Sequence, residues 1–171
     1  DDDHKTLSSV TIQIANGFPG DTLSTSLATT PGIKATYTPD TSTLVLSGSV
    51  TVAAYQVAVR SLKFYTTAQL PYTHPRYVSI TADDGTESSS RSPLTIISIC
   101  ATKGFYANAA RARVQACAQG SYQTQTCATE CTSCAVGTFG KALANALAPG
   151  TSAAAHCETC AQGTYQNQVG Q

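Results

Sequence analysis

The sequence contains no cysteine before Cys100, no methionine and no tryptophan. It also lacks an excess of charge of either sign, because ten basic residues balance ten acidic ones without forming a basic cluster. Nucleic acids and anionic membrane surfaces bind concentrated Lys and Arg, so neither is an expected partner. No apolar run approaches the length of a membrane span, and we expect no direct membrane insertion of this piece.

Other absences argue against catalysis. No serine lies in a Gly-x-Ser-x-Gly elbow, no glycine-rich loop suits a phosphate, and no two carboxylates are framed as an acid/base couple. The histidines His4, His74 and His156 stand in unrelated contexts. We therefore expect that the chain is not an enzyme. The missing initiator Met and signal peptide indicate a piece cut from a longer, processed polypeptide.

The distribution of cysteine divides the chain at Cys100. Residues 1–99 have none and must fold on a hydrophobic core, whereas residues 100–171 hold all seven cysteines and few large aliphatic side chains. Alanines bury little area each, so cross-links must help to offset the chain entropy of the second part. We predict two domains with these bounds, the second truncated at the C-terminus in the middle of a repeat.

Short alternating segments separated by turn residues fill the first part. Val10, Ile12 and Ile14 alternate with polar residues, which is typical of a strand with one buried face. Further strands are indicated at residues 33–37, 44–46, 62–65, 77–80 and 94–99, and Asp83-Asp84-Gly85 predicts a hairpin turn between the last two. About seven strands at this spacing predict an antiparallel β-sandwich.

One segment departs from the alternation. Val52, Tyr55, Val59 and Leu62 recur at spacings of three and four residues. This spacing predicts a short helix over residues 52–60 that crosses from one sheet to the other.

The phrases of the first part resemble a cadherin-like repeat, with an immunoglobulin-like sandwich fold. They are residues 7–12, 20–23, 32–33, 35–37, 44–48, 55–62 and 84–85. The resemblance implies an extracellular spacer or adhesion module, often with calcium at the junctions between repeats. Candidate calcium ligands are Asp1, Asp2, Asp3, Asp83 and Asp84, whose carboxylates supply hard oxygens. The Asp-x-Asn-Asp-Asn run of animal cadherins is missing. A solvated acidic run and an ordinary turn are the alternative interpretation, because calcium needs six or more oxygens.

The second part repeats one phrase, in which cysteine is followed by glycine and an aromatic residue. It occurs as Gly120-Ser-Tyr122 after Cys117, as Gly137-Thr-Phe139 after Cys134 and as Gly163-Thr-Tyr165 after Cys160, and more loosely after Cys100. The glycine would permit a tight turn. An array of small stapled loops is therefore predicted in place of a second hydrophobic core.

These phrases resemble the ephrin-receptor-like cysteine-rich repeat, which is distantly akin to EGF-like and tumour-necrosis-factor-receptor modules. The resemblance, together with the stabilisation gained by closing the loop between them, favours the pair Cys134–Cys157. The resemblance also implies Cys117–Cys131 and Cys100–Cys127. Spacing alone does not fix connectivity, and Cys127 departs from the simplest repeat. An odd number of cysteines leaves Cys160 unpaired in this piece, and we expect its partner beyond residue 171.

A zinc site is the main chemical alternative to disulfides. The pairs Cys131-x-x-Cys134 and Cys157-x-x-Cys160 resemble a zinc ribbon, and four thiolates would complete a tetrahedral site. Three further cysteines in the same register favour disulfides. A redox-active pair is less favoured, because neither Cys131 nor Cys157 opens a helical pattern.

These features together predict a structural module of a large extracellular or cell-surface protein. It would act as a rigid spacer and assembly surface in a filament or matrix, with neighbouring repeats or further copies as partners. The combination resembles algal or protist surface filament proteins, such as those of ciliary mastigonemes, which implies the ciliary surface. The alternative hypothesis is the ligand-binding ectodomain of an adhesion receptor, with the sandwich recognising a glycan or a protein.

Overall fold

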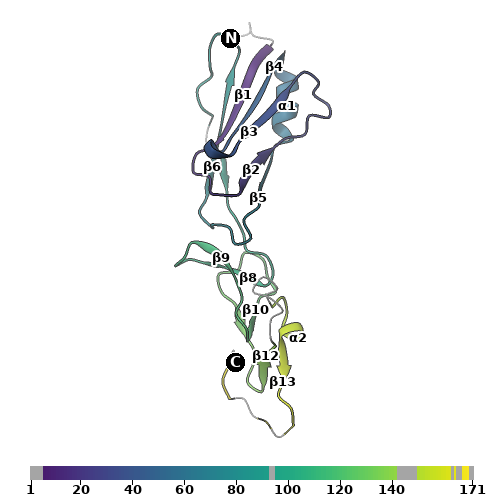
Figure 1. Cartoon of the computed structure of the whole chain (residues 1–171), viewed down its shortest axis with the longest axis vertical. Coiled ribbons are helices and arrows are strands. Elements are labelled where there is room, and N and C mark those ends of the chain that lie inside the picture. The colour runs from purple at the N-terminus through teal and green to yellow at the C-terminus, as the bar shows by residue number, and fades with distance from the viewer. Residues whose placement is uncertain (1–5, 93–94, 142–149, 163, 165–166, 170–171) are drawn as a thin grey trace. The chain divides into compact units, whose positions relative to one another are not determined.

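Antiparallel pairing organises both halves of the chain, which confirms the mainly β fold class (Figure 1). The computed structural model describes residues 6–92, 95–141, 150–162, 164 and 167–169. Its contacts define two units. The N-terminal unit comprises Asp1–Gln69 and Pro75–Ile97, and the C-terminal unit comprises Leu70–His74 and Ser98–Gln171.

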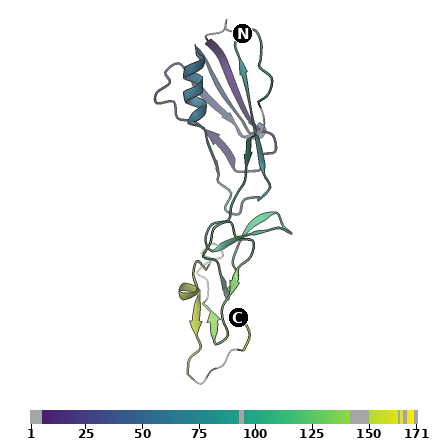
Figure 2. The same ribbon diagram turned by 180° about the vertical axis from the view of Figure 1, so that it is seen from behind.

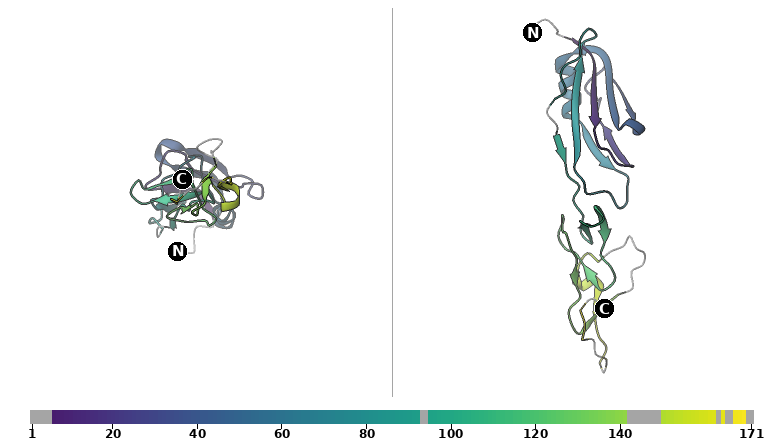
Figure 3. Two further views of the ribbon diagram at one scale, coloured as in Figure 1. Left: turned by 90° about the horizontal axis from the view of Figure 1, so that it is seen from below. Right: turned by 90° about the vertical axis from the view of Figure 1, so that its left-hand side faces the viewer.

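The N-terminal unit is a sandwich of two unequal antiparallel sheets. The large sheet has the order β3-β4-β1-β6-β7, and the small sheet pairs β2 with β5. The strands are β1 (Thr6–Ile14), β2 (Asp21–Ser24), β3 (Lys34–Thr38), β4 (Thr43–Thr51), β5 (Lys63–Thr66), β6 (Arg76–Asp83) and β7 (Thr95–Ile97), with a 3₁₀ turn, η1 (Pro39–Thr41), before β4. Figure 3 shows β6 and β7 at one edge of the large sheet.

The alternation of β1 builds the core. Ile12 lies opposite Leu44 on β4 and Ile80 on β6, so apolar side chains of three strands meet on one face. Leu23 of β2 is buried in the same cluster, and Phe64 of β5 packs against it. The small sheet therefore covers part of the large one, as a sandwich requires. The buried residues of this hydrophobic core are Val10, Ile12, Ile14, Leu23, Ile33, Leu44, Leu46, Tyr55, Ala58 and Val78.

The predicted helix is confirmed as α1 (Val52–Arg60), which leads from β4 in the large sheet to β5 in the small one. Figure 2 shows α1 in front of the large sheet. The hydroxyl of Thr51 caps the helix by accepting a hydrogen bond from the amide of Ala54 at 3.3 Å. Tyr55 and Ala58, one turn apart, are buried against the sheet.

The hydroxyl of Tyr55 anchors α1 to the large sheet. It lies 2.7 Å from the carbonyl oxygen of Gly48 on β4 and 3.0 Å from that of Ser8 on β1. Burial raises the pKa of Tyr55, so the hydroxyl stays protonated and donates. The hydrogen bond to Ser8 lies at the register shift between Leu7 and Ser9 in β1.

Replacing Tyr55 by phenylalanine is expected to lower the free energy of unfolding by about 1–2 kcal/mol, because two partly buried carbonyl groups lose their donor. Chemical denaturation of the N-terminal unit measures the change. Tyr65→Phe is the matched control, since Tyr65 is 47% exposed; we expect its effect to stay within about 0.5 kcal/mol. Equal effects of both variants would contradict the anchoring role.

Beyond the short β7, serine residues form hydrogen bonds with the outer edge of β6. The amide of Ile80 donates to the hydroxyl of Ser92, and the amide of Ala82 donates to the hydroxyl of Ser89, both at 2.9 Å. The main-chain amides of these serines donate back to the same two residues. The predicted turn at residues 83–85 thus leads into a serine-rich segment that imitates a strand.

The C-terminal unit consists of small two-stranded sheets. β8 (Phe105–Asn108) pairs with β9 (Arg113–Ala116), β10 (Ser121–Tyr122) with β11 (Thr132–Ser133), and β12 (Thr138–Gly140) with β13 (Cys157–Thr159); a single helical turn, α2 (Ala153–His156), precedes β13. Residues 70–74, which the sequence analysis placed in the first domain, belong to this unit because they pair with β9.

Candidate functional site

The turns of the C-terminal unit repeat one geometry. In each, an amide donates to the carbonyl three residues earlier, as from Ser121 to Ala118 and from Thr138 to Ala135, both at 3.1 Å. The third position is glycine with φ near +80°, at Gly104, Gly120 and Gly137. A positive φ at this position defines a type II turn, which favours glycine. The cysteine-glycine phrase of the sequence therefore encodes a turn.

The residue after the glycine reinforces the turns at Gly120 and Gly137 with its hydroxyl, whereas Phe105, after Gly104, has none. The oxygen of Ala118 accepts from the Ser121 hydroxyl at 2.8 Å, and that of Ala135 accepts from the Thr138 hydroxyl at 2.6 Å. Thr164 repeats the arrangement, with its hydroxyl 2.7 Å from the oxygen of Ala161. Serine or threonine at this position thus has a local structural cause.

Each repeat is attached to the preceding one by the same backbone hydrogen bond. The amide of a cysteine donates to the carbonyl of the preceding turn glycine, from Cys117 to Gly104 at 2.9 Å and from Cys134 to Gly120 at 2.8 Å. Cys160 donates to Gly137 at 3.0 Å. Close backbone contact adds to this, because a Cβ on Gly140 would lie 2.2 Å from the nitrogen of Gly120.

Three disulfides join the repeats: Cys100–Cys127, Cys117–Cys131 and Cys134–Cys157. They are the pairs that the resemblance implied. The two cysteines of Cys131-x-x-Cys134 belong to different bridges, so these sulfurs do not gather around a zinc ion. Cys160 is a free thiol in this chain. Three bridges fit an extracellular or secreted protein, because reducing compartments keep thiols free.

The proposed calcium ligands divide into two groups. Asp1, Asp2 and Asp3 lie outside the described residues. Asp83 and Asp84 lie in the turn after β6, where their carboxylates accept hydrogen bonds from the backbone amides of the turn. Within the described ranges, no group of three or more His, Cys, Asp or Glu side chains is arranged to hold a metal ion.

Hydrogen bonds lower the pKa of Asp83 below its ordinary value of 3.8. The largest cause is the hydroxyl of Ser88, at 2.5 Å, followed by the hydroxyl of Ser8 at 2.9 Å and the backbone amide of Gly85. These donors favour the ionised carboxylate. Because the folded pKa is lowered, the stabilisation is present above the ordinary pKa and is lost as the pH falls through the folded value.

Replacing Ser88 by alanine is expected to raise the pKa of Asp83 toward its ordinary value, because the strongest donor is removed. A carboxyl-detected NMR titration measures it directly. Ser90→Ala serves as the control, since Ser90 is exposed in the same segment and the pKa of Asp83 does not depend on its hydroxyl. An unchanged pKa in Ser88→Ala would show that the turn does not hold this carboxylate.

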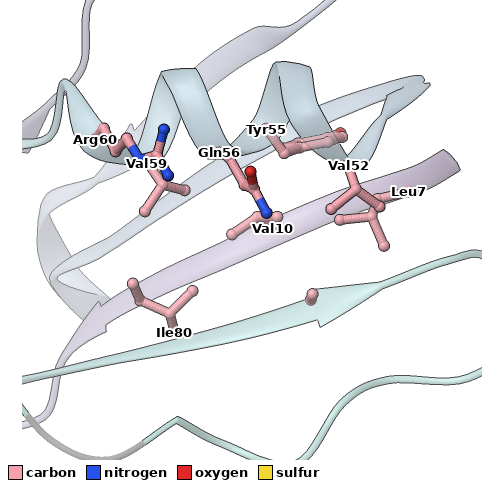
Figure 4. A pocket seen from close by; sticks show the side chains of 9 residues that line it. Leu7, Val10, Val52, Tyr55, Gln56, Val59, Arg60 and Ile80 are labelled. Atoms are coloured by element: carbon pink, nitrogen blue, oxygen red, sulfur yellow. The ribbon is translucent and has the colours of Figure 1, made fainter. Parts of the chain in front are cut away.

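An apolar groove lies between α1 and the large sheet (Figure 4). Val52 and Val59 point into it from the helix, and Val10 and Ile80 line it from β1 and β6. Its volume is about 370 Å³, with Gln56 and Arg60 on its helical side. The groove marks the part of the core face that the small sheet leaves uncovered, and it contains no pair of groups suited to acid/base chemistry.

A buried ion pair between β2 and β6 was not predicted from the sequence. The Nε of Arg76 donates to Asp21 Oδ2 at 2.8 Å, its Nη2 donates to Oδ1 at 3.2 Å, and both side chains have no exposed surface. The ring of Phe18 covers the guanidinium, 4.6 Å from its carbon. The alternation of β6 could have indicated that Arg76 is buried, because Arg76 lies on the same inward face as Val78 and Ile80.

No protein family, curated protein or solved structure matches the chain. The cadherin-like and ephrin-receptor-like resemblances therefore stay predictions. No helix among the described residues is long and apolar enough to cross a membrane.

Proposed function

We propose that the chain is a structural module of a large extracellular or cell-surface protein, acting as a spacer and assembly surface in a filament or matrix. The observation that carries this proposal is the backbone hydrogen bond from the cysteine that opens each cysteine-glycine phrase to the preceding turn glycine, seen at Cys117, Cys134 and Cys160. Such nearest-neighbour links are the means by which repeat proteins extend along one direction.

Disulfides suit this role because they hold a unit that has little core of its own. Buried apolar residues of the C-terminal unit include Ala101, Val114, Cys117 and Cys134, of which two are bridged cysteines. A bridged array also resists proteolysis and local unfolding, since each bridge restricts the opened chain.

The assembly surface that we propose is the outer edge of β3. This strand ends the large sheet, and Lys34, Ala35 and Thr36 are exposed along it. An edge strand offers unpaired backbone groups to a second strand, and one lysine gives it little protection by charge.

Sedimentation velocity over a range of concentrations tests the proposal. We expect the oxidised chain to self-associate, and we expect Ala35→Lys to weaken this association by about tenfold or more, because a charge would be buried at the contact. Thr41→Lys adds the same charge at another exposed position and is the control. A chain that stays monomeric at every concentration would instead favour the receptor alternative.

A further inference from the structure

The two-stranded sheet of β8 and β9, extended by a short segment that pairs with β9, presents an ordered polar face. The segment at residues 71–73 joins β9 by two hydrogen bonds of 2.9 Å, from Val114 to the oxygen of Pro71 and from Thr73 to that of Ala112. Tyr72 therefore lies opposite Arg113, and β8 pairs with the other edge of β9. These three segments belong to one unit.

The pairing places five polar or aromatic side chains on one face. Asn108 lies opposite Arg113 and Tyr106 lies opposite Gln115, and residues two apart on a strand share a face. Tyr72 extends the first row beyond Arg113. The other face carries the buried Val114, so the polar face points away from the interior of the unit.

Hydrogen bonds within this face hold its amides in place. The Gln115 Oε1 accepts from the hydroxyl of Tyr106 at 3.0 Å and from the Asn108 Nδ2 at 2.6 Å. The Asn108 Oδ1 accepts from the amide of Arg111 at 3.1 Å. In the described chain, the Nε2 of Gln115 makes no hydrogen bond with the protein and is not one of its buried unpartnered polar atoms, so its two donors are accessible to solvent.

Arg113, on this face, carries uncompensated positive charge. The guanidinium carbon of Arg113 lies 3.9 Å from the ring centre of Tyr72, and its Nη2 donates to the hydroxyl of the same tyrosine. Within the described residues, no carboxylate forms an ion pair with Arg113 or Arg111. Stacking fixes the orientation of the guanidinium while its charge remains available to an anion.

We propose that this face binds an acidic oligosaccharide, a sugar chain with a carboxylate or sulfate group. Arg113 would bind the anionic group through its planar fork. The ordered amides suit hydroxyl groups, which both donate and accept, and the tyrosine rings suit the apolar face of a pyranose. An acidic peptide would match the charge but would not use the amide pair and flanking rings in this way.

Isothermal titration of the whole oxidised chain with an oligogalacturonate tests this proposal. We expect saturable binding that Arg113→Ala weakens by about tenfold or more, the usual effect of losing a hydrogen bond to a charged group. Arg113→Lys keeps the charge but loses the stacked, planar guanidinium, and we expect its affinity to lie between those of the parent chain and Arg113→Ala. Tyr106→Phe removes one of the hydrogen bonds that hold the amide of Gln115 in place, and we expect it to weaken binding several-fold. Arg60→Ala, at an exposed arginine of the N-terminal unit, is the control.

Two further probes separate sugar recognition from simple charge attraction. A sulfated oligosaccharide of similar length shows which anionic group is preferred, and tighter binding of either one supports the proposal. Polyglutamate should bind at least about tenfold more weakly, because it lacks hydroxyl groups and pyranose faces. Equal binding of polyglutamate, an unchanged affinity in Arg113→Ala, or no binding of either sugar would overturn it. Self-association of the chain is measured separately and does not affect these outcomes.

Discussion

Replacing Arg76 by methionine is expected to lower the free energy of unfolding of the N-terminal unit by about 3–5 kcal/mol. The substitution leaves the carboxylate of Asp21 without its charged partner at a position with no solvent exposure. An unpaired buried charge costs far more than the pair itself contributes. Urea denaturation followed by circular dichroism measures the change.

A double-mutant cycle separates the lost pair from lost packing. We expect Asp21→Asn with Arg76→Met to be more stable than Arg76→Met alone, since no charge then remains buried. Arg91→Met is the control, because Arg91 is exposed and its Nη2 donates to the side chain of Gln13 at 3.3 Å. It should change the free energy of unfolding by no more than about 0.5 kcal/mol. Additive effects of Asp21→Asn and Arg76→Met would contradict a coupled pair.

Removing the bridge Cys134–Cys157 by serine substitution at both positions is expected to destabilise the C-terminal unit by about 3 kcal/mol, the loop-closure value for a loop of this size. The two cysteines are separated by 23 positions in the chain, and Cys134 is fully buried. Because the unit has little other core, we expect it to unfold near ambient temperature. Tryptic digestion should then cleave at Lys141, between the two cysteines.

Cys160→Ser provides the control for this prediction, because Cys160 forms no bridge in this chain. It should leave both the digestion pattern and the melting temperature unchanged. The N-terminal unit contains no cysteine, so its melting should be the same in all three proteins. Equal resistance of the double variant and the parent chain would show that the bridge is not needed.

The sequence predicted the elements whose pattern is strong and local. The alternation at Val10, Ile12 and Ile14 lies in β1, and the spacing from Val52 to Val59 lies in α1. Strand β2 was missed because it has four residues, Asp21–Ser24, of which one is a large apolar residue. Of the segment predicted at residues 94–99, the structure forms β7 at Thr95–Ile97, and Leu94 lies outside the described residues.

Contacts between distant residues were beyond reach of these patterns. Arg76 and Asp21 are 55 positions apart, and their pairing depends on which strands face each other across the sandwich. In the C-terminal unit the glycine turns were predicted from the repeated phrase. The hydrogen bonds that link successive repeats were not, because they join backbone groups, which no residue type identifies. The polar face around Arg113 likewise depends on a loop that returns to pair with β9.

Amide hydrogen exchange before and after reduction tests the central claim most directly, namely that disulfides in place of a hydrophobic core hold the C-terminal unit. In the oxidised chain we expect protected amides at Cys117 and Cys134, which donate to the turn glycines. A phosphine reductant should abolish this protection while the amide of Ile12, in the N-terminal core, stays protected. Protection at Cys117 and Cys134 that survives complete reduction, or that depends on added zinc, would contradict this account.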